Sequence, residues 1–72
     1  MRAPIGISHE KQLYQVIFRT RDGVRNLNYY CDAETPQDAR ELAKNYLAAD
    51  TLRPEIEVGD LRTWQVVEVN LL

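Results

Sequence analysis

The side chains of this chain that could carry chemistry gather where strand-like sequence changes to helix-like sequence. They are Cys31, Asp32, Glu34, Asp38 and Glu41. A metal site needs several carboxylates that converge on one point, and a catalytic thiol needs a lowered pKa and a base beside it. The spacing instead spreads Asp38 and Glu41 around a turn of helix. We interpret the acids as part of a helix start, and the alternatives are an acidic docking surface and a metal or acid–base site.

Helix capping accounts for these acids. Thr35 is a good N-cap, and Pro36 suits the first helical position, where a missing N–H costs nothing. Asp38 follows the cap by three residues, which approximates a capping box. Acids close to the positive end of the helix dipole each stabilise it by a few tenths of a kcal/mol or so. Cys31, on the expected inner side of a strand, should behave as a small buried hydrophobe.

The remaining chemical signals are weak. Ser8, His9 and Glu10 are residue types of a catalytic triad, but triads are assembled in space from separated segments. The three glycines are isolated, so no phosphate-binding loop is present. A single cysteine forms no intrachain disulfide, and one cysteine with one histidine is too few for a Cys/His zinc site. We therefore predict that the protein is not an enzyme and needs no metal or other cofactor.

Two strands joined by a tight turn should open the folded part of the chain. Residues 13–21 alternate between apolar and polar side chains, as a half-buried strand does. Asp22 and Gly23 favour a tight hairpin, because glycine accepts the positive φ that such a turn requires. Residues 24–32 then return as the second strand. The expected inner side chains are Tyr14, Val16, Phe18, Leu27, Tyr29 and Cys31.

A helix and a final strand complete the pattern. The helix should cover residues 36–49, because apolar side chains recur there at helical spacing. The last strand should cover residues 64–72, which are rich in β-branched residues. Residues 51–60 form either a loop or a short strand at 55–58 that turns at Gly59 and Asp60. The apolar stripe of the helix consists of Ala39, Leu42, Ala43, Tyr46 and Leu47.

The order of elements predicts a small α+β domain of the β-β-α-β type. We expect an antiparallel three-stranded sheet with the first strand in the middle, a right-handed crossover and one helix on one face. Residues 1–11 should be a flexible tail and residues 12–72 a single domain. The pattern, with its TPxDA helix start, resembles that of many small modules, some of them ribosome-associated. It matches no named motif, so no residue roles follow from it.

Charge and hydropathy indicate which partners and which cellular compartment to expect. The net charge is −2, with five basic and two acidic side chains in residues 1–31 and four basic and nine acidic side chains in residues 32–72. This balance argues against bulk attraction to nucleic acid. No apolar run approaches the ~18 residues that a membrane span requires. The low cysteine content suits the cytoplasm, so we predict a soluble cytoplasmic protein without membrane contact.

The uncovered face of the sheet is the expected functional surface. Alternation assigns Arg19, Arg21 and Tyr30 to it, and Trp64 as well if the last strand keeps one of its two registers. We expect this face to be partly apolar and to bind a protein partner or a second copy, since Tyr, Trp and Arg are enriched in such contacts. Single-stranded RNA, stacked on the same aromatic residues, is the alternative function. A third interpretation is that the tail or the 51–60 loop covers the face.

Overall fold

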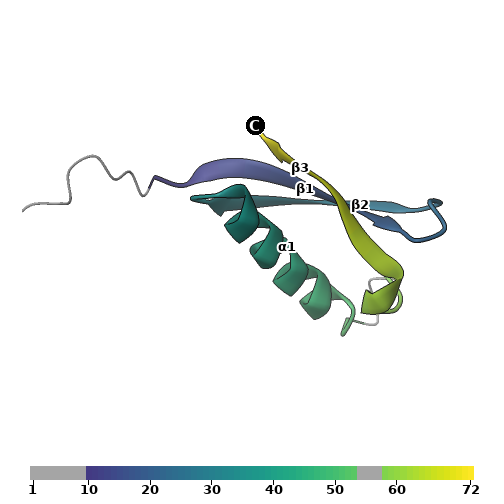
Figure 1. The fold of residues 1–72 in the computed structure, drawn as a ribbon. Coiled ribbons are helices and arrows are strands. Elements are labelled where there is room, and N and C mark those ends of the chain that lie inside the picture. The colour runs from purple at the N-terminus through teal and green to yellow at the C-terminus, as the bar shows by residue number, and fades with distance from the viewer. Residues whose placement is uncertain (1–9, 54–57) are drawn as a thin grey trace, which may run out of the picture.

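The computed structural model describes residues 10–53 and 58–72, which form an open sheet with a helix on one face (Figure 1). The sheet has the order β2-β1-β3, and β1 pairs antiparallel with both neighbours. The predicted α+β fold, with the first strand in the middle, is therefore confirmed. The elements are β1 (Gln12–Thr20), β2 (Asn26–Ala33), α1 (Pro36–Asp50), the short 3₁₀ helix η1 (Leu61–Thr63) and β3 (Trp64–Leu71).

The core lies between α1 and the sheet face that it covers. Leu47 is 1% exposed, and the small residues Ala39 and Ala43 are fully buried, which allows the helix to lie close to the strands. Tyr46 departs from the predicted core, because 46% of its surface is exposed. The buried cluster consists of Tyr14, Val16, Phe18, Cys31, Ala33, Ala39, Ala43, Leu47 and Trp64.

The start of α1 has the predicted cap. Thr35 is extended, with a φ of −137°, and its hydroxyl accepts a hydrogen bond from the backbone N–H of Asp38 at 3.1 Å. Pro36 occupies the first turn. The helix ends at Asp50, where the N–H of Thr51 donates to the carbonyl of Leu47 at 3.0 Å. Local sequence therefore sets the start of this helix.

The connection between β1 and β2 is longer than the predicted two-residue turn. The strands end at Thr20 and begin at Asn26, and Gly23 takes the expected positive φ of 78°. The Thr20 hydroxyl donates to the carboxylate of Asp22 at 2.6 Å and accepts from the N–H of Arg25 at 3.1 Å. These side-chain bonds add to a backbone bond, in which the N–H of Thr20 donates to the carbonyl of Arg25 at 3.0 Å.

A β-bulge in β3 decides which of its side chains face the helix. Phe18 pairs with Val66 and Ile17 with Glu68, so Val67 is an extra residue between two paired positions. The bulge keeps Trp64, Val66 and Val69 opposite inward-facing β1 residues. The placement of Trp64 on the uncovered face is therefore corrected: it lies on the helix side and is 6% exposed.

The segment before β3 does not contain the hairpin turn that one alternative of the sequence analysis predicted. Gly59 and Asp60 do not form a hairpin turn; Asp60 instead caps η1 and accepts from the N–H of Arg62 at 2.9 Å. Most of the alternative strand at 55–58 lies outside the described residues, and Val58 itself is not in a strand. The predicted tail likewise lies largely outside them, and β1 begins at Gln12.

Candidate functional site

The sheet face turned away from α1, here called the open face, is the predicted contact surface. Its members follow from the strand register, because directly paired residues point to the same side of a sheet. No described element covers this side of the sheet in Figure 1. The open face consists of Leu13, Gln15, Ile17, Arg19, Asn26, Asn28, Tyr30, Asp32, Gln65, Glu68 and Asn70.

Hydrogen bonds between side chains order this surface across all three strands. The Gln15 amide donates to the hydroxyl of Tyr30 at 3.4 Å, and the Asn70 amide donates to the Gln15 carbonyl oxygen at 3.3 Å. One row of side chains thus joins β2, β1 and β3. Towards the hairpin, Arg19 donates from Nε to the side-chain oxygen of Asn26 at 2.9 Å. These bonds hold the side chains in defined positions and so reduce the entropy lost on binding.

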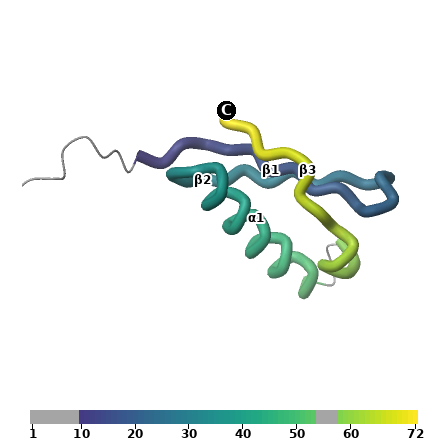
Figure 2. The backbone as a smooth tube through the Cα atoms, in the orientation of Figure 1, coloured from purple at the N-terminus to yellow at the C-terminus, as the bar shows by residue number. Residues whose placement is uncertain are grey.

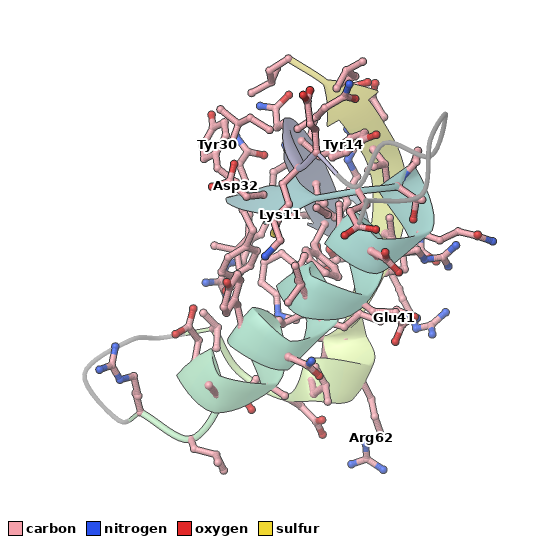
Figure 3. All side chains as sticks on the ribbon, turned by 90° about the vertical axis from the view of Figure 1, so that its left-hand side faces the viewer. Lys11, Tyr14, Tyr30, Asp32, Glu41 and Arg62 are labelled. Carbon is pink, nitrogen blue, oxygen red and sulfur yellow. The ribbon has the colours of Figure 1, made fainter. Side chains whose placement is uncertain are left out.

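The open face is less apolar than the sequence led us to expect. Tyr30 is 57% exposed and Leu13 is 44% exposed, while Ile17 is half-buried. The other members are amides and charged groups, because the bulge turned the apolar side chains of β3 towards the helix. Figure 3 shows Tyr30 and Asp32 on the sheet, well away from Glu41 on the helix. The surface therefore has an aromatic and aliphatic centre within a polar, hydrogen-bonding surround.

The four predicted contact residues fall into three groups. Arg19 and Tyr30 lie on the open face. Arg21 lies beyond the end of β1, where its Nε donates to the carbonyl of Arg62 at 3.2 Å. Trp64 lies on the opposite side, and its indole N–H donates to the carbonyl of Val58 at 2.7 Å.

The structure also places the residues at the strand-to-helix junction. Cys31 is 1% exposed, and burial followed by the charge of Asp32 raises the pKa of its thiol. This is the opposite of what activates a nucleophile. The carboxylate of Glu41 lies 3.8 Å from the ammonium group of Lys44, one turn along the helix. Within residues 10–53 and 58–72, no three acidic, histidine or cysteine side chains come close enough to hold a metal ion. His9 lies outside these ranges.

A groove lies between α1 and β3, and nothing in the sequence analysis predicted it. This α1–β3 groove has a volume of about 410 Å³. Two cations of the helix, Arg40 and Lys44, lie along it at a spacing of four residues, which places them on one face. That spacing was the only signal available in the sequence. The groove is lined by Phe18, Arg40, Lys44, Leu47, Leu61, Trp64, Gln65 and Val66.

A hollow of about 590 Å³ at the hairpin end combines opposite charges. Arg21 and Arg62 line it together with Asp22 and Asp60. Asp60 contacts Arg62 at 2.8 Å, and the side chain and N–H of Arg62 lower the pKa of Asp60 to about 2. Asp22 accepts from Thr20 and from the N–H of Val24, which lowers its pKa. Because these acids already have partners, the hollow is a poorer candidate for a binding site than the open face.

Comparison with known proteins assigns no family to this fold. No protein-family model matches the chain. No curated protein and no solved structure shows a significant match to it. None of the helices in the described ranges is long and apolar enough to cross a membrane. The functional argument therefore rests on the surfaces of the molecule.

Proposed function

We propose that the protein is a non-enzymatic binding module whose open face contacts a partner protein. The exposure of Tyr30 is the main support for this proposal: the residue is 57% exposed on an uncovered sheet face, and its hydroxyl accepts a hydrogen bond from Gln15. Tyrosine provides a large contact area at low entropic cost, and an arginine nearby adds directional hydrogen bonds. Ile17 and Arg19 lie on the neighbouring strand and complete a small contact centre.

The polarity of the face favours a reversible complex with another protein over a permanent homodimer. Obligate homodimers bury surfaces that resemble a hydrophobic core, whereas reversible interfaces are about as polar as the rest of the surface. Five amide side chains lie on this face, so a partner must offer hydrogen-bonding groups of its own. They are Gln15, Asn26, Asn28, Gln65 and Asn70. We propose that this contact takes place in the cytoplasm, since the single cysteine suits a reducing compartment.

The test is a pair of matched double variants. Arg19→Glu with Tyr30→Ala changes the open face, and Arg53→Glu with Tyr46→Ala makes the same replacements on α1 and just beyond its end. Tagged protein would be used to capture partners, with and without nuclease and at two salt concentrations. Circular dichroism would show that both variants keep the fold.

The expected result is loss of the captured protein with the open-face variant only, unchanged by nuclease. Equal capture by the wild-type protein and the open-face variant would contradict the proposal. Capture that disappears with nuclease and weakens steeply with salt would replace it with nucleic-acid binding, because phosphate contacts release counterions.

A further inference from the structure

The helix leaves part of β3 uncovered because its second half leans towards β2. The Tyr29 hydroxyl donates to the carboxylate of Asp50 at 2.5 Å, and the rings of Tyr29 and Tyr46 lie 6.3 Å apart. These contacts tie the second half of α1 to β2. Figure 2 shows α1 running from the end of β2 down to the level of η1, before the start of β3. The α1–β3 groove occupies the side of the helix that lacks such a tie.

The groove combines an apolar floor with a cationic wall. Phe18, Leu47 and Trp64 are almost fully buried yet contribute to its surface, and Leu61 is 42% exposed at its end. The side chain of Arg40 makes no hydrogen bond or ion pair with any other described residue, and the ion pair of the Lys44 ammonium is with the Glu41 carboxylate, at 3.8 Å. An occupant that suits this groove therefore carries an apolar group together with a negative charge.

The edge of β3 that borders the groove has free backbone groups. The N–H of Arg21 donates to the carbonyl of Thr63, and the N–H of Leu72 donates to the carbonyl of Leu13, so these positions pair towards β1. In an antiparallel ladder successive residues point their backbone groups alternately to either side. Val66 consequently points its N–H and carbonyl outwards, because β3 is the last strand on its side of the sheet. The N–H of Trp64 is already bonded to the carbonyl of Leu61.

We propose that the α1–β3 groove binds an extended acidic segment of a partner protein, which adds as a short fourth strand beside β3. The segment pairs its backbone with Val66, places an apolar side chain on the floor of the groove and brings carboxylates to Arg40 and Lys44. Strand addition of this kind takes affinity from backbone bonds and specificity from alternate side chains. The bulge at Val67 limits pairing to a few residues, which suits a weak and reversible contact. This site lies on the helix side of the sheet and shares only Gln65 with the open face.

The probe is a short peptide in which glutamate and valine alternate, with blocked ends. The matched control peptide carries lysine in place of each glutamate. The chain has a single tryptophan, and it lies in the groove, so its fluorescence reports binding directly. Backbone amide shifts from nuclear magnetic resonance then locate the contact. We expect the acidic peptide to shift the amides of Trp64, Gln65 and Val66, and the basic peptide to leave them unchanged.

Two double variants separate this site from the open face. Arg40→Glu with Lys44→Glu reverses the charge of the groove at exposed helix positions, and should weaken binding of the acidic peptide by about tenfold or more at low salt. Lys11→Glu with Arg19→Glu makes the same change in net charge outside the groove. It should leave the affinity for the acidic peptide within about twofold of the wild-type value. Helical circular dichroism would establish that both variants are folded.

Several outcomes would overturn the proposal. They are equal binding of the two peptides, equal binding by the two variants, amide shifts confined to other strands, and no binding of the acidic peptide. Concentration-dependent changes at Trp64 and Val66 without peptide would instead assign the groove to a second copy of the chain. None of these results bears on the open-face proposal, which is tested by Tyr30.

Discussion

Tyr29 joins the sheet to the last turn of α1 through both its ring and its hydroxyl. The ring meets Phe18 edge-on at 5.8 Å, and the hydroxyl donates to Asp50 at 2.5 Å. Burial raises the pKa of Tyr29 above its ordinary value, and the hydrogen bond and negative charge of Asp50 raise it further. The folded state therefore holds this phenol in its protonated form.

This pKa shift predicts that stability falls in alkaline solution. Below about pH 10 the phenol is protonated in both states, whereas above it the unfolded chain releases the proton that the folded chain keeps. Unfolding thus becomes more favourable as the pH rises. Tyr29→Phe should cost about 1–2 kcal/mol at neutral pH and should lose less stability than the wild type as the pH rises above 10. Urea unfolding at several pH values measures both effects, and identical pH dependence in the two proteins would contradict the assignment.

Leu47 and Leu52 provide a matched pair for measuring how much helix burial contributes. Leu47 is 1% exposed beneath the sheet, whereas Leu52, just past the helix end, is 83% exposed. Leu47→Ala should destabilise the fold by about 2–5 kcal/mol, through lost transfer energy and a residual cavity. Leu52→Ala should change stability by less than about 0.5 kcal/mol. Urea midpoints give both values, and similar losses at the two positions would show that the helix is not packed as described.

At the scale of elements, one side-chain hydrogen bond stabilises the start of α1. The Thr35 hydroxyl accepts from the N–H of Asp38 at 3.1 Å. Thr35→Ala should therefore lower stability by about 0.5–2 kcal/mol. Thr35→Ser keeps the hydroxyl and should come close to the wild type. Thermal unfolding followed by circular dichroism compares the three proteins, and an equal loss with serine and alanine would mean that the cap bond contributes little.

The two edge strands are protected from uncontrolled pairing in different ways. By the alternation of the ladder, β2 points its free backbone groups outwards at residues whose side chains lie on the open face, among them Asn28 and Asp32. Polar and charged side chains at such an edge discourage strand-to-strand aggregation. β3 instead carries the bulge at Val67, which interrupts any long added strand. The short stretch of β3 before the bulge, beside the α1–β3 groove, remains suited to pairing.

For the whole molecule, the polar character of the open face predicts a monomer. A stable dimer buries about 1,200–2,000 Å² with an apolar centre, and Tyr30, Ile17 and Leu13 are too few apolar groups for that. Light scattering after size exclusion should give a mass close to 8.4 kDa across a range of concentrations and at two salt levels. A dimer that persists on dilution would contradict this expectation, and it would make self-assembly the proposed function of the open face.

The sequence by itself determined the elements and their order. Thr35 and Pro36 set the helix start, and the alternation of Tyr14, Val16 and Phe18 set the inner side of β1. These signals are short-range, since a cap or an alternating strand involves residues only a few positions apart. The central position of β1 followed from joining one hairpin to one crossover, and the structure confirms it.

Only the tertiary structure decided the surfaces. The side on which Trp64 lies depends on the pairing of β3 with β1 across a long stretch of chain, and a single bulge residue, Val67, sets it. The α1–β3 groove depends on how far the helix leans towards β2, which the bond between Tyr29 and Asp50 fixes. Neither arrangement has a local pattern in the sequence, because each results from packing between residues far apart in the chain.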